Sequence, residues 1–128
     1  MAFHAADELA QVEIGNDYPE IREGVQAICE RFPTSYWREL DREGDFPDEF
    51  VAAMTEAGFL AALIPEEYGG SGLPLRAGAV ILEEIHASGG DAYACHAQMY
   101  MMNIILRHGT QEQKDRYLHR IAAGDLRY

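Results

Sequence analysis

The amino-acid sequence predicts an all-α fold of about five to six helices. Apolar residues recur at intervals of three and four over most of the chain, and proline or glycine interrupts this spacing at several points. The short apolar run that could suit a strand, residues 59–64, has no partner run nearby. With 128 residues, 48% of them hydrophobic, the chain can bury an ordinary core, and we expect residues 1–128 to form a single α-helical domain.

Proline marks both ends of the first predicted helix, which runs from Pro19 to about Phe32. Asp17 is placed to cap its first turn, the proline suits the first helical position, and Pro33 ends the apolar spacing. A second, shorter helix is predicted over residues 34–43.

The third predicted helix opens at Pro47, and Gly58 is the expected left-handed residue at its end. We interpret residues 59–64 as a buried connector, because proline follows this apolar run at once. Residues 69–72 contain three glycines and predict a turn-rich loop.

Three more helices are predicted in the second half of the chain. Pro74 starts a helix that the glycine pair 89–90 ends. Residues 91–108, with Asp91 as the expected cap, form a long helix with apolar residues on two sides, so we expect it to be buried between two partners. Thr110 and Gln113 have the spacing of a capping box and predict the last helix.

The charge balance excludes some classes of partner. Twenty-two acidic residues against ten basic ones leave a net charge of -12, which repels phosphate backbones, so we expect no nucleic-acid partner. No apolar stretch approaches the roughly 20 residues of a membrane span, so no membrane insertion is expected. Residues 1–13 contain two acidic residues near their middle and no apolar signal core, which favours a cytoplasmic location.

Two local patterns suggest a ligand, and each has a simpler structural interpretation. The glycines of residues 69–72 could approach a phosphate, but a phosphate loop needs a preceding strand and a lysine, so we interpret them as a turn. Glu83 and His86 have the spacing of a di-iron ligand pair, but the sequence offers no second such pair. No metal site is therefore predicted.

The remaining reactive side chains are interpreted as structural. Cys29 and Cys95 lie inside predicted helices without a basic neighbour, so we expect reduced, unreactive thiols and no nucleophile. His96 lies within an apolar stripe, where a histidine is usually a hydrogen-bonded core residue, and a role in a site is left open. Asp115 and His119 stand four residues apart and could pair on the last helix.

Several short motifs, in a fixed order, resemble the N-terminal helical domain of the acyl-CoA dehydrogenase family. They are Asp45-Phe46-Pro47, Ala57-Gly58, Ile64-Pro65-Glu66-Glu67-Tyr68-Gly69-Gly70-Ser71-Gly72, Glu83-Glu84-Ile85, His96, Gly109-Thr110-Gln111-Glu112-Gln113-Lys114 and Gly124-Asp125-Leu126. Each motif is weak alone, whereas their order and spacing together are specific. The resemblance covers about residues 18–128.

The resemblance implies an enzyme that uses FAD to oxidise the Cα–Cβ bond of an acyl-CoA thioester and passes the electrons to a separate acceptor. In the family, a β-domain and a C-terminal helical bundle follow this domain, and the catalytic glutamate belongs to the bundle. We therefore expect no catalytic or cofactor-binding residue within these 128 residues, and no tight FAD binding or activity from this chain alone. A homo-oligomer held by the missing domains is also implied.

The resemblance further implies that the helix over residues 91–108 supplies one wall of the acyl pocket. By position, the candidates for substrate contact are Tyr93, Cys95, His96, Met99 and Met102. The competing hypothesis is a natural stand-alone helical subunit or adaptor that has kept the fold without the chemistry. We expect the isolated chain to expose an apolar patch on the face that normally packs against the missing domains, and therefore to self-associate.

Overall fold

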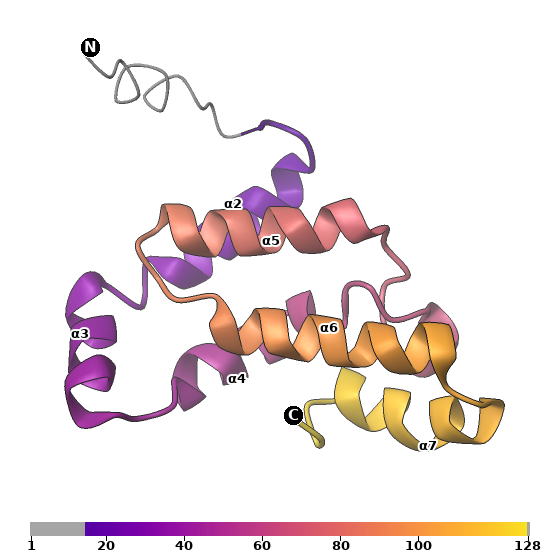
Figure 1. The fold of residues 1–128 in the computed structure, drawn as a ribbon. Coiled ribbons are helices and arrows are strands. Elements are labelled where there is room, and N and C mark those ends of the chain that lie inside the picture. The colour runs from indigo at the N-terminus through magenta and orange to yellow at the C-terminus, as the bar shows by residue number, and fades with distance from the viewer. Residues whose placement is uncertain (1–14, 128) are drawn as a thin grey trace, which may run out of the picture.

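A computed structural model describes residues 15–127, and this part of the chain is all-α, as predicted (Figure 1). The helices are α2 (Pro19–Cys29), α3 (Thr34–Glu43), α4 (Asp48–Glu56), α5 (Leu75–Ala87), α6 (Tyr93–His108) and α7 (Gln111–Ala122), with two 3₁₀ helices, η1 (Phe59–Ala61) and η2 (Glu66–Tyr68). Residues 1–13, on which the cytoplasmic prediction rests, lie outside the described part. Within residues 15–127, no helix has the length and apolar character needed to cross a membrane.

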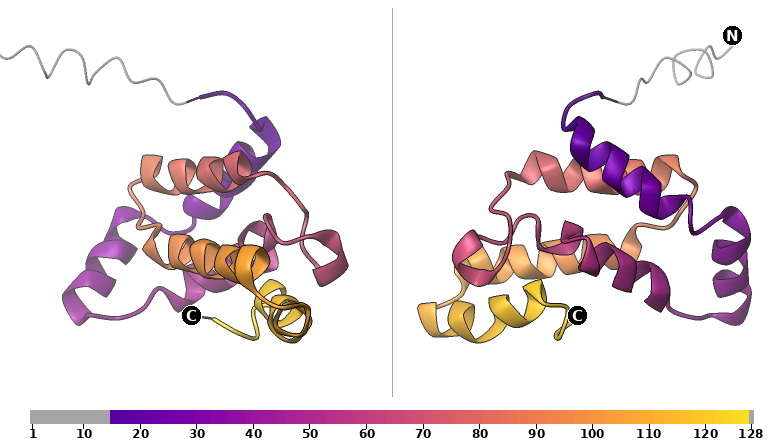
Figure 2. Two further views of the ribbon diagram at one scale, coloured as in Figure 1. Left: turned by 45° about the vertical axis from the view of Figure 1, so that its right-hand side comes forward. Right: turned by 180° about the vertical axis from the view of Figure 1, so that it is seen from behind.

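The long helix α6 lies in the middle of the arrangement. It packs against α5 on one side and α7 on the other, while α2 packs along α5 (Figure 1). Helix α3 stands at one edge, away from α7 (Figure 2). The core runs between α2, α4, α5 and α6 and includes the 59–64 connector, whose residues 60–64 are buried as predicted. Its largest fully buried side chains include Phe50, Met54, Ile64, Ile81, Ile85, Met102 and Leu118.

The predicted helix ends are confirmed at two places. Gly58 ends α4 in the left-handed region, with a φ of 81° that L-residues avoid. At the start of α7, the Thr110 hydroxyl accepts a hydrogen bond from Gln113 N at 3.2 Å, and the Gln113 side chain accepts one from Thr110 N at 2.8 Å. This reciprocal pair is the predicted capping box.

The start of α2 differs from the prediction. Tyr18, with a left-handed φ of 52°, is the N-cap residue of α2, and its side chain makes no capping hydrogen bond. The Asp17 carboxylate instead accepts hydrogen bonds from Arg22 at 2.6 Å and from Arg76 at 2.7 Å. Two guanidinium groups outcompete backbone amides for this carboxylate, because hydrogen bonds between charged groups are the stronger ones.

The last helix is held to η2 by polar and aromatic contacts. Gln111 Nε2 donates to the Tyr68 hydroxyl at 2.9 Å and to Asp115 at 2.8 Å. The His119 ring packs against Tyr68 with a centroid distance of 5.3 Å. Asp115 therefore pairs with Gln111, and the Asp115–His119 pair suggested by the spacing does not form.

Helix α6 departs from the prediction of burial on two sides. Its inner side is buried, with Cys95 and Met102 fully covered and Met99 4% exposed. Its outer side carries Ile104, which is 51% exposed. Its partners among the described residues, α5 and α7, leave this second apolar side of the helix facing outward.

Candidate functional site

The outer face of α6 gathers most of the large apolar side chains that the described residues leave exposed. Tyr93 is 63% exposed, Ile104 51%, Tyr100 44% and Met101 40%, and outside α6 this class holds Phe46 and Leu75. His96 is exposed beside them, and its ring packs edge-on against Tyr100 with a centroid distance of 5.5 Å. Residues three, four and seven apart share one side of a helix. We call these five side chains, Tyr93, His96, Tyr100, Met101 and Ile104, the outer face of α6.

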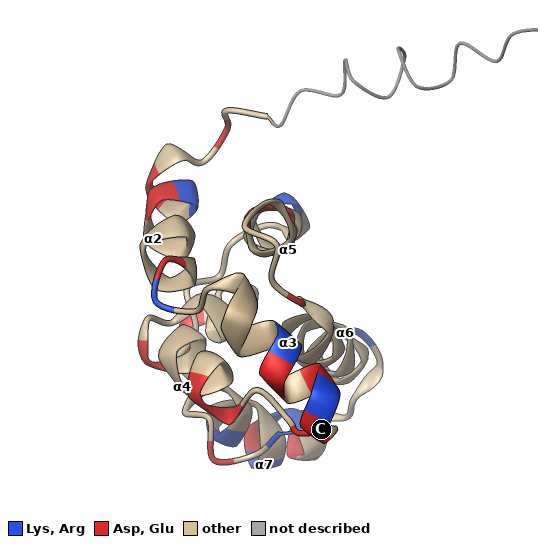
Figure 3. Cartoon of the chain, turned by 90° about the vertical axis from the view of Figure 1, so that its left-hand side faces the viewer, with Lys and Arg blue, Asp and Glu red and all other residues tan. Residues whose placement is uncertain are grey.

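This outer face is free of acidic residues. The stretch from Ala92 to Gln111 contains no aspartate or glutamate, although the chain has 22 of them. Figure 3 shows the contrast between α6 and helix α3, on which acidic and basic residues alternate. The outer face is therefore a place on an acidic protein where an apolar or anionic group meets little like-charge repulsion.

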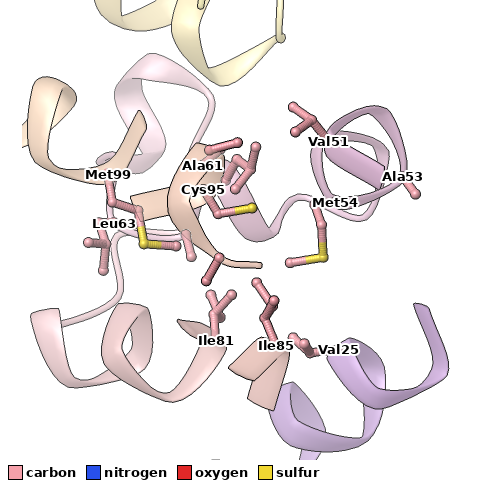
Figure 4. Packing of buried hydrophobic residues seen from close by; sticks show 14 of the residues in the cluster. Val25, Val51, Ala53, Met54, Ala61, Leu63, Ile81, Ile85, Cys95 and Met99 are labelled. Atoms are coloured by element: carbon pink, nitrogen blue, oxygen red, sulfur yellow. The ribbon is translucent and has the colours of Figure 1, made fainter. Parts of the chain in front are cut away.

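The five residues predicted for substrate contact fall on two opposite sides of α6. Cys95 and Met99 point into the core, toward the cluster that contains Met54 and Ile81 (Figure 4), and Met102 is also buried. Tyr93 and His96 lie on the outer face. The expectation that His96 is a core residue is wrong, because the helix turns its side chain about 100° away from Cys95.

Three residues of the outer face, Tyr100, Met101 and Ile104, were not among the predicted contacts, and Tyr100 had the clearest signal. Tyr100 lies four residues after His96 and seven after Tyr93, and it packs against the histidine ring. The signal was present in the sequence as aromatic or imidazole rings at positions 93, 96 and 100. Methionines at positions 99, 101 and 102 make both sides of the helix apolar, so the spacing of the rings alone did not distinguish this side.

Cys95 has the environment of an inert structural thiol. Burial raises the pKa of Cys95 to about 12, with a smaller contribution from Cys29 and Asp91. Burial also raises the pKa of Cys29, which a hydrogen bond with Ser88 partly offsets. Both thiols are buried, unbonded to each other and protonated at neutral pH. This agrees with the expectation of reduced, unreactive cysteines.

A small groove continues the outer face toward α7. It has a volume of about 220 Å³, and its lining side chains are Gln98, Met101, Ile105, Tyr117, Ile121, Leu126 and Arg127. Most of this lining is apolar. Gln98 is only 5% exposed, and its side-chain amide donates a long 3.5 Å hydrogen bond to the carbonyl of Leu126. Met101 belongs both to this groove and to the outer face, so the two form one continuous apolar surface.

The glycine loop is a closed turn, as the sequence predicted. The amides of residues 69–72 donate to carbonyls of residues 66, 65, 61 and 64 at 2.9, 3.2, 3.2 and 2.8 Å, in that order. A Cβ on Gly70 would lie 2.0 Å from the Ile64 carbonyl oxygen, so only glycine fits there. Because all four amides are already used, this loop offers no donors to a phosphate.

A cluster of charged and polar side chains, in which Arg22 and Glu84 are buried, joins α2 to α5. We call it the α2–α5 seam; it consists of Asp17, Arg22, Gln26, Arg76, Glu83 and Glu84. Arg22 is 6% exposed and Glu84 4% exposed, and Arg22 Nη1 lies 2.7 Å from Glu84 Oε1. Gln26 Nε2 donates to the second oxygen of Glu84 at 2.8 Å. Both oxygens of the buried carboxylate therefore have a partner.

The outer carboxylates of the seam surround the same guanidinium. Asp17 bridges Arg22 and Arg76, and Glu83 lies 2.9 Å from Arg22 Nη1. Hydrogen bonds from Arg76 and then Arg22 hold the pKa of the Asp17 carboxyl well below its usual range. Burial alone would raise the pKa of Glu84, but hydrogen bonds from Gln26 and Arg22 outweigh it, so the pKa is lowered.

Glu83 and His86 do not form the ligand pair that their spacing allows. Glu83 is turned toward Arg22, while His86 is exposed. Across residues 15–127, no three histidine, cysteine or acidic side chains come together in a way that could hold a metal ion.

Comparison with known proteins identifies similar chains. The family model described as acyl-CoA dehydrogenase, N-terminal domain, matches residues 16–125. A probable acyl-CoA dehydrogenase of Mycobacterium tuberculosis is 32% identical over 113 residues, covering 87% of this chain and 29% of that protein. The short-chain specific acyl-CoA dehydrogenase of Sus scrofa mitochondria is 31% identical over 117 residues, covering 89% of this chain and 28% of that protein. A 3-(aryl)acrylate reductase of Clostridium sporogenes is 37% identical over 89 residues, covering 68% of this chain and 24% of that protein. The chain thus spans less than a third of each of these relatives.

Proposed function

Because the chain belongs to the acyl-CoA dehydrogenase family, through its N-terminal domain, we propose that it is the helical domain of an enzyme that introduces a Cα–Cβ double bond into an acyl-CoA thioester. The role we assign to it is one wall of the acyl pocket. The observation that carries this proposal is the outer face of α6, an exposed, acid-free apolar surface in a family whose substrates are apolar acyl groups. A cytoplasmic location of the complete enzyme is part of the same proposal.

The contact residues divide according to their side of α6. Tyr93 and His96 are the proposed direct contacts, and Tyr100 joins them because its ring packs against His96. Cys95, Met99 and Met102 remain proposed pocket residues, but their burial in the core means that they would act by setting the position of α6. Met101 extends the proposed wall into the α6–α7 groove.

FAD is the proposed cofactor of the complete enzyme, where it would accept a hydride from the acyl β-carbon while a base takes the α-proton. The residues of this chain do not by themselves suit its pyrophosphate. The amides of the glycine loop are used internally, and the net charge of -12 opposes a polyanion. The flavin contacts and the catalytic base are therefore assigned to other parts of the enzyme, as is the site that passes electrons to an acceptor.

The alternative of a stand-alone adaptor has less support. The adaptor hypothesis predicts a partner chain that covers the outer face of α6. The matched relatives are instead single chains more than three times as long as these 128 residues. Reading the gene beyond the codon for Tyr128 separates the two hypotheses, because a continuing open frame favours the enzyme and an immediate stop favours the adaptor.

The experiment compares the chain of residues 1–128 with the longest natural open frame that contains it. We expect the longer protein to co-purify with FAD and to lose flavin absorbance when an acyl-CoA is added, and the short chain to do neither. Stoichiometric FAD and turnover by residues 1–128 alone would contradict the proposal.

A further inference from the structure

We propose that the acyl group of the substrate carries an aromatic ring, which packs against the row of rings formed by Tyr93, His96 and Tyr100. This inference rests on the proposed function, because it takes the outer face of α6 as the acyl wall. It goes further by naming the kind of acyl group. The names of the matched relatives include short-chain and arylacrylate specificities, so the choice has to come from the residues of this chain.

The three rings form one row along the helix. They occupy positions 93, 96 and 100, which share a side of α6 and extend over about 10 Å of its length at 1.5 Å per residue. Tyr93 is 63% exposed and Tyr100 44%, and the His96 and Tyr100 rings already stand edge to face at a 65° angle. A further ring can continue this arrangement without displacing any side chain of the core.

The chemistry of the row favours an aryl group over a plain alkyl chain. An alkyl chain against this wall gains only from buried area, whereas an aromatic ring also gains from edge-to-face contact with the rings. The described residues also offer no hydrogen-bond partner to the Tyr93 or Tyr100 hydroxyl or to the His96 side chain, which are solvated on this open face. Either kind of acyl group would remove water from these polar groups, so the preference for an aryl group rests on the ring contacts.

The charge pattern agrees with an uncharged or electron-rich ring. Residues 92–111, which carry the row, contain no carboxylate that would repel the negative face of an aromatic system, and the carboxylate of Asp91 just before them accepts a hydrogen bond from Tyr93 N at 2.8 Å. The imidazole of His96 and the hydroxyls of the tyrosines present positive hydrogen atoms instead. The non-aromatic members of the outer face, Met101 and Ile104, follow the rings in sequence on the same helix.

The test uses the complete flavoprotein and two thioesters of matched shape, 3-phenylpropanoyl-CoA and 3-cyclohexylpropanoyl-CoA. The quantity measured is the ratio of their kcat/KM values, compared between wild type and variants so that the intrinsic reactivity of each thioester cancels. Tyr93→Leu and Tyr100→Leu are each expected to lower the ratio about 2- to 12-fold, the scale of one aromatic pair. Phe46→Leu removes an exposed ring outside α6 and is the matched control, with no change expected.

Two further variants separate the rings from their hydroxyls. Tyr93→Phe and Tyr100→Phe keep the rings and should keep the ratio; a loss as large as that of the leucine variants would overturn the role of the rings. If a leucine variant loses its FAD, Tyr93→Met or Tyr100→Met replaces it under the same criterion. A ratio that stays within twofold of wild type in both ring-deleting variants, at full FAD content, overturns the inference and leaves the proposed function intact. Absence of turnover with these thioesters and with butanoyl-CoA overturns the proposed function, and the inference with it.

Discussion

The α2–α5 seam and the outer face of α6 depart from the usual distribution of side chains in opposite ways. The seam places charge inside the protein, with Arg22 and Glu84 almost fully buried. The outer face places hydrocarbon outside, with Tyr93 and Ile104 more than half exposed. The difference between them lies in their partners. Both oxygens of the buried Glu84 are paired within the chain, whereas the outer face meets no described residue that covers it.

This contrast separates structure from proposed function within one small fold. A buried charge is tolerated only when its pairing is complete, so the seam has the properties of a finished structural element. An exposed apolar helix face costs solubility and gives no stability to the chain that carries it, so it indicates a surface meant for contact with something else. Three predictions test this separation, in order of decreasing effect on the stability of residues 1–128.

The largest effect is expected when the seam loses its cation. Arg22→Met leaves the buried Glu84 carboxylate without its charge partner, a change that typically costs about 3–5 kcal/mol. The free energy of unfolding is measured by urea titration followed by circular dichroism. Arg42→Met is the matched control, because Arg42 pairs with Glu39 on the exposed surface of α3 and such pairs contribute at most about 1 kcal/mol. Equal losses of unfolding free energy in the two variants would contradict a structural role for the seam.

The next effect is a loss of stability in acid. The pKa values of Asp17 and Glu84 are lowered in the folded protein from ordinary values of 3.8 and 4.5. The folded state therefore binds protons less readily than the unfolded chain, and the stabilisation is present above these values and lost as pH falls through the folded ones. The urea midpoint should be flat above about pH 5 and fall below about pH 4.

The same titration on Arg22→Met supplies the control for this acid effect. The acid-dependent fall of the urea midpoint should be smaller in that variant, since hydrogen bonds from Arg22 help to lower both pKa values. An identical pH profile in wild type and variant would place the acid sensitivity elsewhere in the chain.

The smallest effect on stability, and the largest on association, is expected on the outer face. Ile104→Glu should change the unfolding free energy by less than about 0.5 kcal/mol, because the side chain is half exposed. Sedimentation should show that the wild-type chain self-associates at high concentration. A separate dye-binding measurement should show that it binds a hydrophobic dye. The variant should do both less. A wild-type chain that stays monomeric and binds no dye would argue against an exposed apolar contact surface.

Local signals in the sequence were sufficient for most of the helix ends. The capping box at Thr110 and Gln113, the left-handed Gly58 and the turn at residues 69–72 all involve partners within a few residues. Asp17 was assigned to the wrong partner, because its ligands Arg22 and Arg76 lie five and 59 residues away. Sequence spacing favours the nearby amide, whereas the fold brings the distant guanidinium close.

The sequence by itself determined the fold class, the family and the identity of α6 as the helix to inspect, because helical periodicity, turn chemistry and ordered motifs are all local. Only the tertiary structure decided which side of α6 is the inside. Both sides are apolar, so periodicity could not separate the core residues Cys95, Met99 and Met102 from the exposed Tyr93, His96 and Tyr100. That choice depends on where α4, α5 and α7 pack, and it is made by the burial of area between segments far apart in the chain.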